Sequence, residues 1–238
     1  MTDQQNAGMI PAGAVVARDI RIGTTVTAAD FGAGAEPAGP QEVQVGAGGD
    51  PLVIGVPAFV VGSLVLGIVL IGVSPIPLAG MVPVILAGTS FFQLVAAVWA
   101  ILLGQGMVAC IMALFSGFWA SLTLLLLGLA HNWYAIPLSM VGNEELIFFI
   151  AWDVIFFFLM IIMLRLPAIY PAILALAVAA VTLVIFGLEF AGATTTLFQA
   201  AGACVIAFCA LGVWAFMHIG SVSLGGPAFP PLGPALVK

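Results

Sequence analysis

From Leu52 onward, long apolar stretches alternate with short breaks rich in proline, glycine or polar residues. A helix needs about 20 residues, rising 1.5 Å each, to cross ~30 Å of hydrocarbon. Every stretch reaches that length, and none has the alternating ten-residue pattern of a membrane β-barrel strand. The pattern therefore predicts six transmembrane helices, near residues 52–73, 79–103, 106–130, 144–166, 168–188 and 195–219.

The two ends of the chain differ from this apolar region. Residues 1–50 are rich in glycine, alanine and proline and contain six acids and two bases. We expect a polar N-terminal tail at 1–50, a six-helix membrane domain at 51–220 and a short C-terminal tail at 221–238. The N-terminal tail has segments of local strand character, and its composition is also compatible with disorder. The predicted fold class is an all-α integral membrane protein.

The amino-acid composition indicates whether water or lipid surrounds this fold. Hydrophobic residues make up 63% of the 238 residues and charged residues 6%, whereas about a quarter of an ordinary soluble chain is charged. Too few charges remain to keep the surface in water. The lipid bilayer is therefore the expected partner, and a soluble enzyme is excluded.

The few charges predict an orientation. Six spans place both termini on one side of the membrane, and cytoplasmic loops carry the excess of Lys and Arg. The four basic residues all fall on the side of the termini: Arg18, Arg21, Arg165 and Lys238. The other side receives Glu144, Glu145, Glu189 and His131. We therefore expect a plasma-membrane protein (the inner membrane in a bacterial cell) with both termini cytoplasmic.

Motifs for catalysis are absent from the sequence. It contains no nucleophile elbow, no phosphate-binding loop and no basic patch, so catalysis, ATP-driven pumping and nucleic-acid binding are not expected. Three cysteines, Cys110, Cys204 and Cys209, lie in apolar stretches without metal-ligand spacing. We expect no cofactor and no metal.

One carboxylate stands out within a predicted span. Asp153 lies eight residues after Glu145 and twelve before Arg165, hence ~12 Å and ~18 Å from them along a helix. An aspartate at mid-membrane costs about 2.5–3.5 kcal/mol on insertion scales. No cation is expected at that depth, so the neutral form should be favoured there. Polar side chains on other spans that could reach it are Gln93, Ser116, Ser121 and Thr182.

Two interpretations of Asp153 remain open at this stage. It either forms a hydrogen bond between helices that specifies packing, or it carries a proton along a water-filled path. A contact at the axis of an oligomer is a further alternative.

Several motifs, in order, resemble the acetate uptake transporter family of bacterial acetate/succinate transporters and fungal acetate or ammonia-export relatives. The family's Asn-Pro-Ala-Pro-Leu-Gly-Leu signature is similar to "DPLVIGVPAF", with Asp50 in place of Asn and Val53 in place of the second proline. Its Ser-Tyr-Gly-x-Phe-Trp-x-Ser motif is similar to "LFSGFWAS" at 114–121. Gln93, Trp152 and "PLG" at 231–233 also align. The resemblance covers residues 50 to about 233.

This resemblance implies six-helix protomers, each with its own pore, assembled as a homo-oligomer, a hexamer. It implies small carboxylates as solutes: acetate-like monocarboxylates and succinate. The family's hydrophobic constriction of phenylalanine, tyrosine and leucine maps onto Phe59, Phe115 and Ala177. The two changed positions lose a hydroxyl and widen the ring, which leaves room for a larger or more apolar solute.

The same alignment gives the remaining candidates. Asp50, Pro51 and Gly55 form the expected pore-mouth signature. An ionised aspartate only accepts hydrogen bonds, so Asp50 would repel an anion; alternatively, it caps the first helix. Further pore-lining or polar candidates are Gln93, Ser116, Ser121 and Asp153.

Three functions therefore remain as hypotheses. The first is a channel or transporter for acetate-like monocarboxylates and succinate, with or without a linked proton. The second is a channel for a neutral solute such as ammonia, and the third is a non-conducting accessory subunit of a membrane assembly.

Overall fold

The structure, a computed structural model, describes residues 49–72 and 77–237. These residues form helices and no β-strand. The helices are α1 (Leu52–Leu70), α2 (Pro77–Pro83), α3 (Phe91–Leu102), α4 (Gly106–Ala130), α5 (Val141–Met163), α6 (Ile169–Glu189) and α7 (Thr194–Ser223). A π-helical segment, Val84–Ser90, joins α2 to α3, and a 3₁₀ turn, Leu138–Met140, precedes α5. Most of the predicted N-terminal tail and of the break after α1 lies outside the described residues.

Six of these helical stretches are long and apolar enough to cross a membrane: 52–70, 80–102, 106–130, 138–163, 169–189 and 194–223. The prediction of an all-α membrane protein with six spans is confirmed, although the ends differ by a few residues. Large apolar side chains cover the outside of the helices, including Phe91 and Phe92 on α3 and Phe157 and Phe158 on α5. Such a surface is stable in lipid and not in water.

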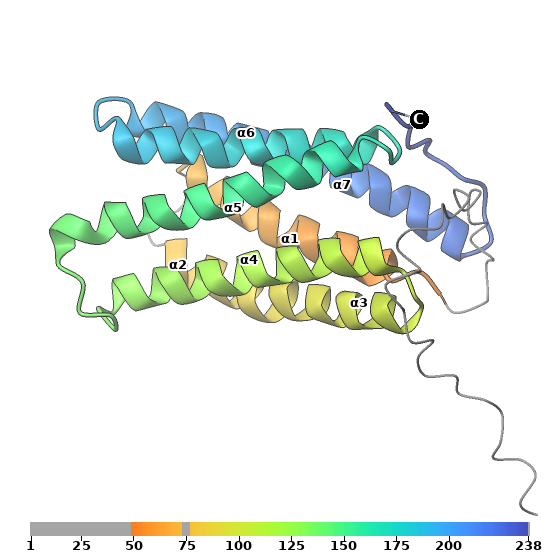
Figure 1. Cartoon of the computed structure of the whole chain (residues 1–238), viewed down its shortest axis with the longest axis horizontal. Coiled ribbons are helices and arrows are strands. Elements are labelled where there is room, and N and C mark those ends of the chain that lie inside the picture. Colours follow the sequence, from red (N-terminus) through yellow and green to blue (C-terminus); the bar gives the residue numbers. More distant parts are fainter. Residues whose placement is uncertain (1–48, 73–76, 238) are drawn as a thin grey trace, which may run out of the picture. The chain divides into compact units, whose positions relative to one another are not determined.

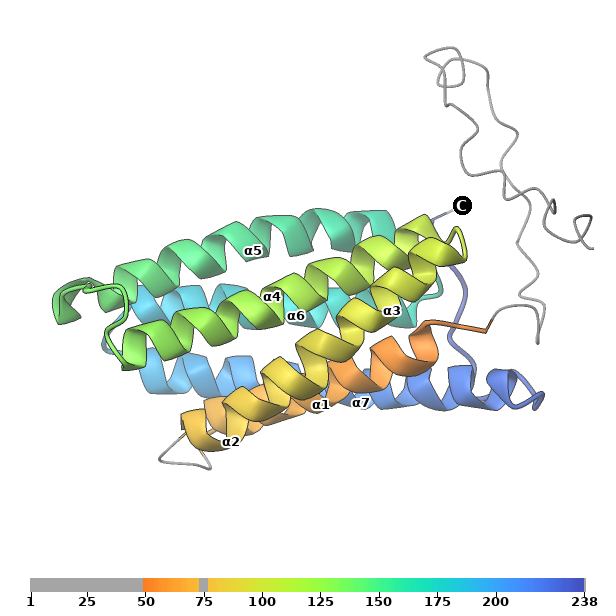
Figure 2. The same ribbon diagram turned by 90° about the horizontal axis from the view of Figure 1, so that it is seen from below.

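The helices form a closed circuit (Figures 1 and 2). α1 packs against α7, α7 against α6, and α6 against α5. On the other side, α1 packs against the π segment and α3, which in turn pack against α4. The circuit closes between α4 and α5, which touch only marginally. Side chains of six helices, α1, α2, α4, α5, α6 and α7, face a common interior.

Small residues allow the close approaches in this circuit, as expected for helices packed in lipid. Gly62 lies against the side chain of Thr89 in the π segment. A Cβ added at Gly67 would lie 3.0 Å from Ile206 Cγ1 and 3.1 Å from Val205 Cγ1 of α7. A methyl group at Gly62 would overlap the Thr89 side chain, and one at Gly67 would press against these two side chains of α7.

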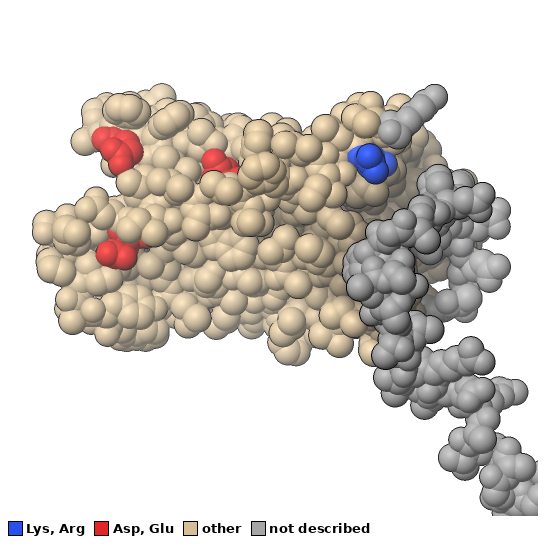
Figure 3. All heavy atoms as spheres, viewed as in Figure 1, with Lys and Arg blue, Asp and Glu red and all other residues tan. Residues whose placement is uncertain are grey.

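The two ends of the bundle carry different charges. Because successive spans alternate in direction, Arg165 in the α5–α6 connection lies at the end where α1 begins and α7 ends. Glu144, Glu189 and His131 lie at the opposite end. On the face shown in Figure 3, the acidic atoms gather toward one end, with a single acidic patch partway along, and the basic atoms lie at the other end.

The C-terminal segment folds back over the α5–α6 connection. Helix α7 continues to Ser223, beyond the expected boundary at 220. Backbone N–H groups of Ala168 and Ile169, in the first turn of α6, donate to the carbonyls of Pro234 (3.0 Å) and Leu232 (3.2 Å). These bonds satisfy two donors that a helix start leaves without partners.

Candidate functional site: two cavities separated by an aromatic layer

Two cavities lie inside the helix circuit. The Glu145 cavity has a volume of about 210 Å³ and is lined by residues of α1, α2, α4, α5, α6 and α7. The Tyr170 cavity has a volume of about 160 Å³ and is lined by residues of α1, α4, α6, α7 and the end of α5. Phe59 and Phe115 line both cavities. These two side chains therefore stand where the cavities meet.

Phe59 and Phe115 belong to a layer of four contacting rings, the aromatic layer, that crosses the interior; the central pair meets edge to face and the outer pairs are stacked. The ring centroids of the central pair are 4.8 Å apart, and the outer neighbours are Phe208 of α7, 5.3 Å from Phe59, and Phe156 of α5, 5.1 Å from Phe115. All four rings are buried. Contacts of this kind favour offset or edge-to-face geometry and hold the rings in place. A solute moving between the cavities must pass this layer.

Ala177 of α6 lines the Glu145 cavity together with Phe59 and Phe115. The structure thus brings the three predicted constriction residues to the wall of one cavity. Sequence reasoning missed Phe156 and Phe208. Phe156 begins a run of three phenylalanines, and which of the three faces the interior cannot be predicted without knowing the neighbouring helices.

The expected pore-mouth residues lie at the start of α1. The Asp50 carboxylate accepts a hydrogen bond from the Leu52 N–H (Oδ1 to N, 2.9 Å), as the capping interpretation requires, while Pro51 occupies the N-cap position itself. Burial raises the pKa of Asp50 above its ordinary value of 3.8, and the Leu52 N–H partly offsets this. Gly55 is buried against Met112 and Ala96.

The other polar candidates lie away from the two cavities. Ser116 of α4 and Ser90 exchange hydrogen bonds, each hydroxyl donating to the other's backbone carbonyl at 2.9 and 3.0 Å. Ser121 donates back to carbonyls of its own helix. Gln93 is fully buried, and neither of its side-chain polar atoms has a partner among the described residues.

Asp153 makes a hydrogen bond between two helices. Thr182 Oγ1 of α6 donates to Asp153 Oδ2 at 2.9 Å, so of the polar neighbours proposed for it Thr182 is the one that bonds. The other oxygen, Oδ1, is buried with no hydrogen-bond partner among the described residues. Neither Asp153 nor Thr182 lines the two cavities.

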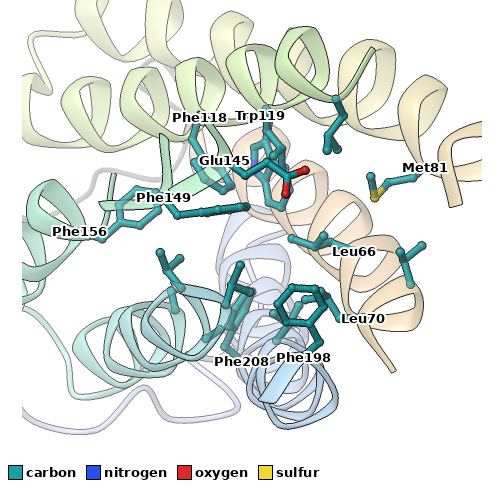
Figure 4. Close-up of a pocket in the computed structure, with 18 of the residues that line it drawn as sticks. Leu66, Leu70, Met81, Phe118, Trp119, Glu145, Phe149, Phe156, Phe198 and Phe208 are labelled. Carbon is teal, nitrogen blue, oxygen red and sulfur yellow. The ribbon is translucent and has the colours of Figure 1, made fainter. Parts of the chain in front are cut away.

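The walls of both cavities are almost entirely apolar. Among the described residues, no Lys, Arg or His lines either one, and Tyr170 supplies the hydroxyl of the second. In the first cavity the lining residues with a polar group are Glu145 and Trp119, whose indole N–H is buried. Figure 4 shows Glu145 and Trp119 at one wall, with Phe198 and Phe208 opposite.

Comparisons with known proteins agree with this architecture. The sequence model of the GPR1/FUN34/yaaH family matches residues 31–222, so the match begins earlier than the resemblance that starts at residue 50. A comparison with curated proteins gives no match. Among solved structures, the bacterial acetate channel SatP superposes with a TM-score of 0.67 at 15% identity, over 76% of this chain and 98% of that chain. This chain is therefore a member of the GPR1/FUN34/yaaH family.

Proposed function

We propose that this chain is a membrane channel or transporter for small monocarboxylates such as acetate. The observation that carries the proposal is the pair of apolar cavities that meet at Phe59 and Phe115 inside a closed circuit of spanning helices. Family membership and the fold shared with an acetate channel support it. Transport, rather than catalysis, is the role that such an interior serves.

Two cavities with one aromatic layer between them form an interrupted path through the protomer. A layer of packed rings excludes water and hydrated ions, and a small displacement of one ring opens it to a solute of a few atoms. The path is thus a property of one protomer, and a homo-oligomer, a hexamer by resemblance, multiplies it. Succinate would present a second carboxylate to the same apolar walls, so we expect it to pass more slowly than acetate.

The direct test is uptake of labelled acetate, propionate and succinate into proteoliposomes, with and without an imposed proton gradient. Uptake above that of protein-free liposomes is expected for acetate and propionate. Acceleration by the gradient would establish proton linkage. No protein-dependent uptake of any acid would overturn the proposal and leave the ammonia-channel and accessory-subunit hypotheses.

A neutral solute such as ammonia is a second candidate, favoured by cavity walls without a cation among the described residues. Burying an anion without a compensating charge or donor is costly, whereas a small neutral molecule avoids that cost. Dissipation of a preset pH difference by ammonia in the same proteoliposomes separates this candidate from the first.

The orientation follows from charge. Arg165 lies at the end of the bundle that carries the start of α1 and the end of α7, which favours a cytoplasmic location for that end and for both termini. Trp133→Cys should be labelled by an impermeant thiol reagent from outside intact cells, and Leu236→Cys should not. The reverse labelling would invert the orientation.

A further inference from the structure

The polar pair in the Glu145 cavity suggests what this cavity binds. Glu145 lies on the same face of α5 as Phe149 and Phe156, at helical spacing, and all three line the cavity. Trp119 of α4 is 2% exposed, and its Nε1 has no hydrogen-bond partner among the described residues. A buried donor without a partner is costly, so a ligand that supplies an acceptor there would be stabilised.

The two groups have opposite hydrogen-bonding character. An ionised carboxylate can only accept and an indole N–H can only donate. A neutral carboxylic acid matches both, because its O–H donates while its carbonyl oxygen accepts. A carboxylate anion matches only the indole and is repelled by Glu145.

The rest of the cavity suits an aliphatic chain. Beyond the polar pair, its wall consists of apolar side chains, among them Leu66, Leu70, Phe149, Phe198 and Phe208. Its volume of about 210 Å³ is many times the ~10–15 Å³ that a single water needs. Each methylene that a ligand buries there should tighten binding about fourfold.

We propose that the Glu145 cavity is a binding site for the undissociated form of short aliphatic acids longer than acetate. The carboxyl group lies between Glu145 and Trp119, and the alkyl chain points toward Phe59 and Phe115. This inference rests on the proposed transport of monocarboxylates and adds the chemical form and the size of the preferred solute.

Other titratable groups near this end of the bundle do not line the cavity. They are Glu144, one residue before Glu145 on α5, Glu189 at the end of α6, and His131 in the α4–α5 connection. Glu144 is therefore a matched control for Glu145: it has the same charge and lies on the same helix turn.

The test is saturation-transfer NMR of butyrate with the full chain purified in detergent. From about pH 3.5 to 7.5, a range that spans the ordinary pKa of an aliphatic carboxyl (roughly 4–5), the apparent Kd should be level below that pKa and rise about tenfold per pH unit above it. The more acidic 2-chlorobutyrate should show the same profile displaced to lower pH. This displacement distinguishes the proton on the solute from a proton on Glu145.

The variants locate the site. Glu145→Gln should weaken the dependence of the apparent Kd on pH, because the glutamine amide can donate to the anion and carries no charge. Glu144→Gln should show the same pH dependence as the unaltered chain. Acetate should bind at least tenfold more weakly than butyrate, which has two more methylenes. If Glu145→Gln does not fold, the displacement seen with 2-chlorobutyrate still decides the matter.

Equal butyrate affinity at pH 5.5 and 7.5, or identical effects of the two glutamine variants, would overturn the inference. Preferential binding of butylammonium would also overturn it and would identify a cation site built from a carboxylate and aromatic rings. Acetate uptake without this binding pattern would refute the inference alone. The binding pattern without uptake would refute the proposed function alone.

Discussion

At the scale of single residues, the carboxylates of the described residues differ in their hydrogen bonds and in their position relative to the two cavities. One carboxylate oxygen of Asp153 accepts a hydrogen bond from Thr182, and Asp153 lines neither cavity. Asp50 accepts from the first turn of α1. Among the carboxylates of the described residues, Glu145 lines one of the two cavities inside the bundle. The sequence leaves two interpretations of Asp153 open, packing and proton transport. Its placement in the structure favours the first, packing between α5 and α6.

Asp153→Asn should consequently leave assembly and acetate uptake unchanged at every pH, with or without a proton gradient. The asparagine oxygen can still accept from Thr182. Thr182→Val, by contrast, removes the donor and should cost about 1–3 kcal/mol of stability. Thermal unfolding and proteoliposome uptake measure the two effects. Loss of gradient-driven uptake in Asp153→Asn, with assembly intact, would restore the proton-carrier interpretation.

Asp50 gives a prediction about pH. Because burial raises its pKa above 3.8, the folded protein binds this proton more tightly than the unfolded chain does. The corresponding stability is fully present below pH 3.8 and is lost as the pH rises through the raised pKa. Asp50→Asn should remove this part of the pH dependence while keeping an acceptor for the Leu52 N–H. Melting temperatures of the two proteins across the acid range test it, and parallel curves would contradict it.

At the scale of elements, the sequence predicts the six spans because apolar length is a property of each segment alone. The π-helical segment Val84–Ser90 has no such local signal: it follows Pro83, which lacks an N–H, and it places Thr89 and Ser90 against other helices. From the sequence, Glu145 is placed only among the charges on the side of the membrane opposite the termini. Its place in the wall of a cavity depends on how α5 packs among the other helices, which no single segment encodes.

The packing of α1 on the π segment leads to a prediction at this scale. A methyl group at Gly62 would overlap the Thr89 side chain, whereas one at Gly88 meets open space. Gly62→Ala should therefore lower stability by about 1–3 kcal/mol, the usual cost of overpacking, and Gly88→Ala should have little effect. Thermal unfolding in detergent compares them. Equal melting temperatures would show that α1 and the π segment separate without cost.

At the scale of the whole membrane domain, the helix circuit explains why an interior path exists at all. Helices that pack mainly against their neighbours in a closed order leave space at the centre, and large aromatic rings fill part of it. The resemblance of short motifs led to Phe59, Phe115 and Ala177, which the structure brings to one cavity wall. The outer rings of the layer, Phe156 and Phe208, emerge only from the assembled bundle.

The central claim is that solute passes through the protomer beside this aromatic layer. Its most direct test is thiol modification of Ala177→Cys in a background without Cys110, Cys204 and Cys209, followed by labelled acetate uptake in proteoliposomes. Ala175→Cys is the control, because Ala175 is exposed on the outside of the same helix. Modification at 177 should abolish protein-dependent uptake, and modification at 175 should leave it unchanged. Full uptake after modification at 177, verified by mass spectrometry, would contradict the account.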